Sequence, residues 1–418
     1  MSGALEGVRI IDLTRVWAGP LAVRMLADLG AEVIKVEGLA ARGMANVPPS
    51  VGKMLGVYAD DDTGEHPWNR HALFNDFNRN KFGITLELNT HQGAEILKRL
   101  VKISDIIIDN YTPRVMPNFG LGYDILRRIN PSIVMVSMPG FGMTGPYRDY
   151  MALGTTLEPA SGMSSLMGYR GGPPHISGNA YPDPVASLNA AAAVLVALWH
   201  REQTGEGQFV DVAQIEGTTC LIGEAVLGYA MTKEIPERMG NRDISKAPQG
   251  CYRCRGDDRW IAIAVSSDEE WEALCCTMGG PPWAKDERFS DQLSRRKNQD
   301  ELDRLLETWT IQHDHYEIMY LLQGAGVPAG AALDAKELVT DAHLQAAGFF
   351  WDIDEREAGR RIYAGLPIRL STTPAQLRLP APCLGEHNEY VLGEILGLPK
   401  EDISQLESDG IIGTVPTD

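Results

Sequence analysis

The stretch VRIIDLTRVWAGPLAVRMLADLGAEVIKVE (residues 8–37) indicates the class of the fold. Its two ends, 8–13 and 31–37, are short apolar runs rich in Val and Ile, which are typical of buried strands. Between them, apolar residues recur at helical spacing, with Pro20 in the first turn and Gly30 at the end. A strand, a helix and a strand within about 30 residues form a β-α-β unit, whose strands are parallel.

The same alternation continues through the first 140 residues. We expect strands at 84–88, 105–110 and 132–138, with helices at 91–103 and 122–129. The strands read as continuous apolar runs, as strands buried on both faces do. The sequence therefore predicts an α/β fold with an open parallel, Rossmann-like sheet.

Beyond this region the composition changes. Residues 139–183 are rich in Gly, Pro and Ser, and a loop of that length is usually functional. The rest of the chain predicts helices at 184–203 and 214–232, strands at 207–213, a hairpin at 251–265, a mostly helical stretch at 266–325 and short strands near 326–333. We expect a large domain from 1–224, a smaller α+β domain from 225–325, and a return to the large domain at 326–418.

Composition narrows the partners and the compartment. The chain has 418 residues, of which 22% are charged, and its formal net charge is −18. Nucleic acid and anionic membrane surfaces need a basic face, so we expect neither as a partner. We see no signal peptide and no unbroken apolar run long enough for a membrane span, and six cysteines are too few for a disulfide scaffold. A cytoplasmic enzyme or binding protein is expected.

Asp183 is the carboxylate that the sequence singles out. It stands between two prolines in GNAYPDP (178–184), directly before a run of small apolar residues. One interpretation is an N-cap, in which the side chain accepts a backbone N–H and Pro184 takes the first helical position. The other is that the carboxylate does chemistry. The stretch alone leaves both open.

Other candidate motifs are weak. The turn TRVWAGP (14–20) lacks the glycine spacing of a dinucleotide site, so no nucleotide cofactor is expected, although a helix N-terminus there could receive an anion. Cys251 and Cys254 have C-x-x-C spacing but no second ligand pair, so no metal is predicted. Arg79 and Lys81 precede a strand and are either a solvated face or a phosphate-binding pair.

Eight ordered blocks of the sequence resemble the family III CoA-transferases of the CaiB/BaiF type. They run from about residue 5 to residue 411 and include the opening stretch, NRNKFGITLELNT, DNYTPRVMPNFGLGY, SMPGFGMTGPY, SGNAYPDP, TGEGQFVDVA, GVPAGAALDAKELVTDAHLQAAGFF and LGEHNEYVLGEILGL. The resemblance implies a large α/β domain, a small domain and an interlocked dimer. The chain as a whole also resembles the subunits of succinyl-CoA:benzylsuccinate CoA-transferase. This resemblance implies a homodimer or a heteromer of homologous chains.

The resemblance implies that Asp183 is the catalytic nucleophile. CoA would pass between two carboxylic acids through an aspartyl-CoA thioester, with the CoA thioester as substrate and with no metal. An aromatic or dicarboxylic acid such as benzylsuccinate is expected, with succinyl-CoA as donor. The residues expected to bind the CoA thioester or the acid are Arg15, Trp17, Ala18, Lys35, Arg79, Lys81, Asn110, Tyr111 and Phe141.

The chain departs from the family pattern at four positions. Gly154 stands where many transferases carry an acid, and Leu153 where racemases of the family use a histidine. Pro139 and Asn118 replace a lysine and an arginine. The segment 240–250 stands where one relative has a glycine-rich loop. Three alternatives therefore stay open: a weakened subunit that supports an active partner, an acyl-CoA racemase or isomerase, and a CoA-ester-binding regulatory protein.

Overall fold

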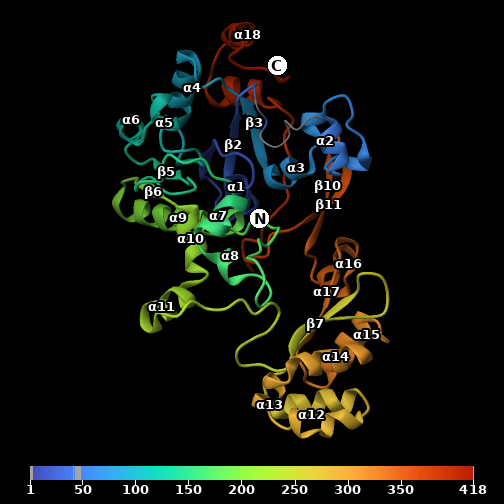
Figure 1. The fold of residues 1–418 in the computed structure, drawn as a ribbon. Helices are drawn as coiled ribbons and strands as arrows, with labels where there is room; N and C mark the ends of the chain where they lie inside the picture. Colours follow the sequence, from blue (N-terminus) through green and yellow to red (C-terminus); the bar gives the residue numbers. More distant parts are fainter. Residues whose placement is uncertain (1–2, 41, 43–48, 418) are drawn as a thin grey trace. The chain divides into compact units, whose positions relative to one another are not determined.

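The computed structural model describes residues 3–40, 42 and 49–417, which form two compact units. Unit 1 consists of residues up to 164, 176–233 and 345 onward, and unit 2 of residues 165–175 and 234–344. Figure 1 shows the chain coloured along the sequence, with the elements labelled as in the text.

Unit 1 is built on a six-stranded parallel sheet with the strand order β3-β2-β1-β4-β5-β6. Its strands are β1 (Arg9–Asp12), β2 (Glu32–Glu37), β3 (Lys81–Thr85), β4 (Ile106–Asp109), β5 (Val134–Ser137) and β6 (Phe209–Asp211). The chain order reverses between β1 and β4, and in open α/β sheets ligands bind at the carboxyl ends of strands at such a point. The predicted fold class is confirmed, and the sheet points to the loops after β1 and β4.

Helices cover both faces of this sheet (Figure 1). The helices of unit 1 are α1 (Ala18–Asp28), α2 (Pro49–Met54), α3 (Ala72–Asn78), α4 (His91–Lys102), α5 (Val115–Asn118), α6 (Tyr123–Ile129), α7 (Gly154–Ala160), α9 (Pro182–Thr204), α10 (Gln214–Cys220), α11 (Gly223–Thr232) and α18 (Lys400–Ser408), with α8 (Met163–Leu166) at its boundary. Because strand side chains alternate, Ile10 faces a core that contains α1 and α9, whereas Ile11 faces a core that contains α4. A π-helical turn (Tyr390–Ile395) and a hairpin of β10 (Phe350–Glu355) and β11 (Gly359–Ala364) also belong to unit 1.

Unit 2 holds a three-stranded antiparallel sheet and a helical layer. The strands are β7 (Gln249–Arg253), β8 (Trp260–Ala264) and β9 (Ala329–Ala332), in that order. The helices are α12 (Asp268–Thr277), α13 (Gln292–Lys297), α14 (Gln299–Thr310), α15 (His315–Gly324) and α16 (Ala335–Thr340), followed at the boundary by α17 (Ala342–Ala346). The core includes Tyr252, Trp271 and Phe289.

Three expectations about elements differ from the structure. β3 starts at Lys81 rather than at residue 84, since Lys81 pairs in register with Val33 of β2. The stretch 139–183 is not a continuous loop, because it contains α7 and α8, and the predicted helix 214–232 is divided into α10 and α11.

The boundaries of the units also differ from the expected ranges. β9 pairs with β8, so the small unit extends to 344 instead of ending at 325. Residues 165–175, inside the stretch expected to be a loop of the large domain, belong to unit 2 as well.

Helix α9 is long and apolar enough to cross a membrane by length and composition alone. Its small residues, among them Ala186, Ala190 and Val194, are buried in the core that it shares with α1. A core helix of this kind passes the same test of length and apolarity as a membrane span.

Candidate active site

The start of α1 lies against the Asp183 side chain. The backbone N–H of Ala18, the first residue of α1, donates a hydrogen bond to Asp183 Oδ1 at 3.3 Å. The buried Ser187 hydroxyl lies 2.6 Å from the Ala18 carbonyl oxygen and 2.8 Å from that of Asp183. The first turns of α1 and α9 are therefore fixed to each other, and the carboxylate lies at the N-terminal, electropositive end of α1.

A sharp turn after β1 places the N-terminus of α1 beside Asp183. Val16 has φ of +67°, a left-handed conformation that is strained for a β-branched residue. Gly19 allows the turn to close, because a Cβ at this position would lie 2.3 Å from Thr14 Cβ. Backbone strain of this kind clusters at functional sites, so the turn supports the assignment of the site.

Gly154, the first residue of α7, borders the other carboxylate oxygen. A Cβ at residue 154 would lie 1.8 Å from Asp183 Oδ2 and 2.8 Å from Ala180 Cβ. No side chain other than hydrogen fits at position 154 while Asp183 holds this conformation. The position at which this chain departs from the family pattern, residue 154, is therefore in direct contact with the candidate nucleophile.

The carboxylate of Asp183 is buried without a counter-ion. Burial raises its pKa to about 6, against the lowering effects of the hydrogen bonds from Ala18 and from its own backbone. In the part of the chain that the structure describes, no cation pairs with it. A carboxylate with this pKa is largely ionised at neutral pH and is poorly solvated, which suits a nucleophile.

The N-cap interpretation of Asp183 is wrong. Helix α9 begins at Pro182, with Tyr181 at the N-cap position, so Asp183 lies inside the first turn. Its backbone N–H donates to the Ala180 carbonyl, and its side chain accepts from the Ala18 N–H at the start of α1. The side chain therefore connects two helices rather than ending one.

Arg15, Asn110 and Tyr111 meet at the carboxyl ends of β1 and β4. The Asn110 side chain forms two hydrogen bonds of 2.8 Å with the Arg15 backbone, one to its N–H and one to its carbonyl oxygen. The Arg15 guanidinium lies 5.7 Å from the centre of the Tyr111 ring. Within the described residues, Arg15 forms no ion pair, so its charge is available to an anion.

Trp17 stands directly before the amide that binds Asp183. Its indole ring stacks on Phe77 of α3, with the ring centres 5.7 Å apart. The indole Nε1–H is buried without a hydrogen-bond partner among the described residues. A buried donor without a partner is costly, which makes it a candidate for contact with a ligand.

Phe141 lies in an aromatic cluster after β5. Its ring contacts those of Tyr147 and Tyr150, with centres 5.9 Å and 6.0 Å away. Both tyrosines are exposed. Phe141 is therefore part of an accessible aromatic surface.

Three expected cofactor-binding cations do not lie in this site. Lys81 is completely buried and donates to Asp12 Oδ2 at 2.9 Å and to the Asn78 side chain at 2.9 Å. Lys35 is buried, lies 3.6 Å from the other oxygen of Asp12 and donates to the Thr14 carbonyl. Burial alone would raise the pKa of Asp12, but these two ammonium groups outweigh it and lower that pKa.

Arg79 is buried in the same way. Its guanidinium forms a two-point ion pair with Asp28, at 3.2 Å and 2.8 Å, and donates to the Ala364 carbonyl. The expectation that Lys35, Arg79 and Lys81 bind the CoA thioester is thus corrected: their side chains are buried inside unit 1, where both lysines pair with Asp12 and the arginine pairs with Asp28, so they are not exposed to a phosphate.

Sequence reasoning missed Glu158 and Ser177. Glu158 on α7 is 1% exposed and accepts hydrogen bonds from the Ser177 N–H at 2.6 Å and from its hydroxyl at 2.7 Å. Helix α7 was hidden by the glycine at its start and by Pro159 within it. The signal that could have found Glu158 is an acidic residue inside an otherwise uncharged stretch, 150–168.

The remaining departures from the family pattern lie near the same strand ends. Asn118 ends α5, after β4, and Pro139 follows β5, where its carbonyl oxygen accepts from Gln214. Leu153 is exposed and precedes Gly154. Among the described residues, no group of three or more His, Cys, Asp or Glu comes together to hold a metal ion.

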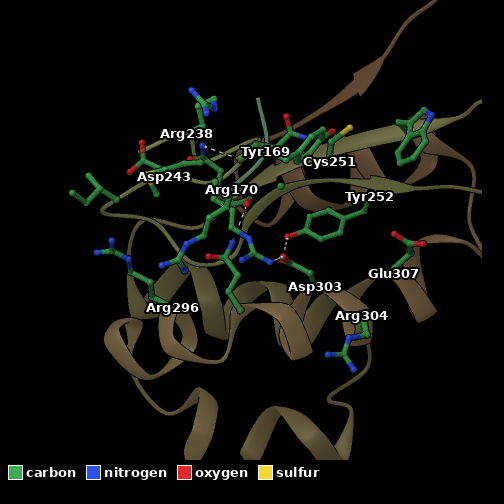
Figure 2. Close-up of a pocket in the computed structure, with 18 of the residues that line it drawn as sticks. Tyr169, Arg170, Arg238, Asp243, Cys251, Tyr252, Arg296, Asp303, Arg304 and Glu307 are labelled. Carbon is green, nitrogen blue, oxygen red and sulfur yellow. Dashed lines mark hydrogen bonds and ion pairs between the residues drawn. The ribbon is translucent and has the colours of Figure 1, made fainter. Parts of the chain in front are cut away.

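Unit 2 contains a separate cavity of about 1050 Å³ (Figure 2). The segment 240–250 contributes Asn241, Arg242 and Asp243 to its wall. Arg242 in this wall is paired, since it contacts Asp300 at 2.6 Å and Asp303 at 2.7 Å, and Asp303 accepts from Tyr252. All the residues that line the cavity belong to unit 2.

Comparison with known proteins agrees with this geometry. The sequence profile described as CoA-transferase family III matches residues 5–388. Succinyl-CoA–D-citramalate CoA-transferase from Chloroflexus aurantiacus is 34% identical over 98% of this chain and 98% of its own length. The beta subunit of succinyl-CoA–L-malate CoA-transferase from the same organism is 32% identical, again over 98% of both chains.

A solved structure shows the same fold. The crystal structure of a CAIB/BAIF family protein from Brucella suis superposes with a TM-score of 0.84 at 29% identity, covering 94% of this chain and 100% of that one. The resemblance read from the sequence is confirmed at the level of the family. The chain belongs to CoA-transferase family III and is a CoA-transferase.

Proposed function

We propose that this enzyme moves CoA from succinyl-CoA to a second dicarboxylic acid, with Asp183 as the nucleophile. The observation that carries the proposal is the Asp183 carboxylate, which is buried without a counter-ion and held by the first N–H of α1 at the switch point of the sheet. A transfer of CoA between acids needs an acceptor that is itself a carboxylate, and Asp183 has the required ionisation and position.

The covalent steps balance without a proton, a metal or a nucleotide. An Asp183 oxygen forms a bond to the acyl carbon of the donor, the carbon–sulfur bond breaks, and CoA leaves as a thiolate. The thiolate attacks Asp183 Cγ and releases the donor acid as a carboxylate, which leaves an aspartyl-CoA thioester. The acceptor carboxylate then attacks Cγ and displaces the CoA thiolate, which gives a second mixed anhydride. The thiolate attacks the acyl carbon of the acceptor in this anhydride, and Asp183 leaves as a carboxylate.

The N-terminus of α1 stabilises negative charge at Asp183 during these steps. Negative charge moves from Asp183 to the thiolate and back, so the site must tolerate both an ionised and an acylated aspartate. The Ala18 N–H donates to the oxygen in either state, and the field of α1 favours negative charge at this point. Because the donor is fixed by the backbone, little reorganisation accompanies the reaction.

The acid substrate is inferred from the cation and the donor beside Asp183. Arg15 has no ion pair among the described residues, and a guanidinium binds a carboxylate at two points. The buried Trp17 Nε1–H lacks a partner, and its ring offers an apolar wall. The two relatives named above act on citramalate and malate with succinyl-CoA, which supports a dicarboxylate. Benzylsuccinate is the aromatic acid to compare with them.

Six of the expected binding residues remain in the proposed site for the CoA thioester and the acid. They are Arg15, Trp17, Ala18, Asn110, Tyr111 and Phe141, which follow β1, β4 and β5. The Asn110 side chain fixes the Arg15 backbone, so its role is to hold the loop as well as to contact substrate.

We further propose an interlocked dimer in the cytoplasm, either of two copies or with a homologous chain. Helix α11 has no buried residue, although Val226, Leu227 and Met231 are large and apolar, and Trp199 on α9 is 70% exposed. Apolar surface of this extent marks a protein interface. One relative is the beta subunit of a two-subunit enzyme, which supports the heteromer. The six free cysteines fit a reducing compartment.

A trapping experiment tests the proposed function. The purified enzyme is incubated with succinyl-CoA and then with hydroxylamine or borohydride, and the modified residue is located by mass spectrometry. We expect modification at Asp183 in the wild type and none in Asp183→Asn, together with transfer of CoA to malate, citramalate or benzylsuccinate.

Other results would support the alternatives. Modification that appears only on an added homologous chain would make this chain the weakened subunit. Exchange of the α-hydrogen of an acyl-CoA, without transfer of CoA, would identify a racemase or isomerase. CoA-ester binding without turnover would identify a regulatory protein, and each of these results contradicts the proposal.

A further inference from the structure

The carboxylate of Glu158 is buried in unit 1 without a cationic partner among the described residues. It is 1% exposed, and both of its oxygens accept hydrogen bonds from one residue, Ser177. The donors are the Ser177 N–H, at 2.6 Å from Oε1, and the hydroxyl, at 2.7 Å from Oε2. A carboxyl group buried to this degree is costly unless it is hydrogen-bonded, and the two bonds from Ser177 meet that need.

Ser177 belongs to the segment 176–181, which leads directly into the first turn of α9. This segment holds two residues with positive φ, Gly178 at +77° and Ala180 at +43°. Among the described residues, the segment is hydrogen-bonded to α9, which follows it, through the Ala180 and Tyr181 carbonyls, and its two other hydrogen bonds to an element of unit 1 both end on Glu158. The Ser177 hydroxyl also accepts from the Asn179 N–H at 3.2 Å, which extends the contact toward Ala180.

Helix α7 also contacts the carboxylate of Asp183, which follows the segment 176–181 in the chain. The first residue of α7 is Gly154. A Cβ added to it would point at Asp183 Oδ2 and at Ala180 Cβ. The fifth residue of α7 is Glu158. One short helix therefore sets both the position of the segment before α9 and the space beside the Asp183 side chain.

We propose that Glu158 is a positioning residue, which holds the segment 176–181 through Ser177 and thereby fixes the Asp183 carboxylate between Gly154 and the N–H of Ala18. The inference rests on the proposed nucleophilic role of Asp183. Glu158 touches no reacting atom. Its removal releases the strained turn at Ala180, and the carboxylate then moves away from the α1 N-terminus toward solvent.

The first test compares Glu158→Ala with Glu158→Gln and Ser177→Ala. We expect Glu158→Ala to lower kcat about tenfold or more and to change KM about twofold or less, because orientation rather than binding is lost. In Glu158→Gln the amide oxygen accepts the Ser177 N–H and the hydroxyl turns to accept from the amide nitrogen, so most of kcat returns. Ser177→Ala keeps one of the two bonds and gives an intermediate value.

The second test reads the Asp183 carboxylate without using activity. Enzyme labelled with 13C at aspartate carboxyl carbons is titrated by NMR, and the Asp183 signal is assigned by its absence in Asp183→Asn. In Glu158→Ala we expect the pKa of Asp183 to fall from about 6 toward its ordinary value, because the carboxylate gains solvent. Asp291, an exposed aspartate that binds the N–H and hydroxyl of Ser294 in unit 2, is the control, and Asp291→Ala should change neither reading.

The two tests separate the inference from the proposed function. If Glu158→Ala retains the wild-type kcat and the wild-type titration of Asp183, the positioning role is wrong even where trapping at Asp183 succeeds. If the titration shifts but the wild type is not modified at Asp183 by the trapping reagents, Glu158 positions the carboxylate and the nucleophilic role fails.

Discussion

At the scale of the residue, the negative charge on Asp183 lowers the stability of the folded protein. The folded-state pKa is about 6 against an ordinary value of 3.8, so the fold favours the protonated form. The ionised form therefore destabilises the native state as the pH rises from about 4 through 6. A catalytic carboxylate in this environment is a case of function opposing stability.

The substitution Asp183→Asn tests this opposition. The amide keeps an acceptor for the Ala18 N–H but carries no charge, so we expect it to be more stable than the wild type by about 1–3 kcal/mol at pH 8. Near pH 4 the two proteins should unfold at similar denaturant concentrations. Urea unfolding at both pH values is the measurement, and a gain that is independent of pH would contradict the assignment of the charge as its cause.

Activity should follow the same titration. Because attack needs the carboxylate, kcat/KM is expected to rise with pH through about 6 and then to level off. Initial rates with succinyl-CoA between pH 5 and 8 provide the profile. A profile that falls over this range would show that the protonated form is the active one.

Gly154→Ala is the smallest change that should displace the nucleophile. The added Cβ would lie 1.8 Å from Asp183 Oδ2, so the carboxylate must rotate or move. We expect kcat to fall about a hundredfold or more, since a shift of about 1 Å at a reacting group costs that much. Gly324→Ala is the control, because a Cβ at that helical glycine meets nothing within 4 Å. Wild-type kcat in Gly154→Ala would show that the side chain has another functional position.

At the scale of the element, the turn from β1 to α1 is held from β4. Asn110 supplies both hydrogen bonds to the Arg15 backbone, so it joins two neighbouring strand ends of the sheet. The turn itself is strained at Val16, and strain persists where surrounding contacts fix it. The amide that binds Asp183 therefore depends on a residue about 90 positions further along the chain.

Asn110→Ala should show this dependence. The loss of two backbone contacts is expected to cost about 1–3 kcal/mol of stability and to raise KM for the acid, because Arg15 loses its fixed position. Asn130→Ala is the control: it removes the 2.9 Å bonds to the carbonyl oxygens of Val101 and Ser104 and the two bonds that the Asn130 oxygen accepts from Ser132. We expect the control to lose stability but to keep KM, and equal kinetic effects in the two variants would argue against the role of Asn110.

The elements also show what the sequence could and could not predict. Apolar runs and helical spacing were enough for the six strands of the parallel sheet, since burial on both faces leaves a clear pattern, but they did not predict the hairpin of β10 and β11. The buried charges were not predictable in this way. Arg79 and Lys81 precede or begin a strand, as a phosphate site would require, and only the folded sheet brings Asp28 and Asp12 against them.

The site itself was predictable only in part. Asp183, Trp17 and Arg15 came from the family resemblance, whereas Glu158 and the contact of Gly154 depend on a short helix with weak sequence signals. A helix that contains Pro159 and starts with glycine has low intrinsic propensity, and tertiary contacts decide its formation.

At the scale of the whole molecule, the exposed apolar side chains of α11 require an explanation. Leu227 and Met231 are 60% and 75% exposed in the single chain, on a helix without a buried residue. A helix of this composition is not stable in water by itself and gains its stability from packing. We expect a second chain to cover α11 and to provide that packing.

We therefore expect the purified protein to have the mass of two chains in size-exclusion chromatography with light scattering. The double substitution Leu227→Glu with Met231→Glu should reduce this mass to that of one chain or cause aggregation, because four negative charges would face each other across a two-fold interface. Leu293→Glu changes an exposed leucine on α13 and should leave the mass unchanged. A single-chain mass for the wild type would contradict the dimer.

The contact between Gly154 and Asp183 has a consequence for the evolution of the gene. Every single-base missense change of a glycine codon introduces a residue with a Cβ, and each such residue would meet Asp183 Oδ2. Position 154 therefore has no neutral neighbour in the genetic code while the carboxylate keeps its present rotamer. We therefore expect the nucleophile to take a different conformation in any sequence that carries an acid at this position.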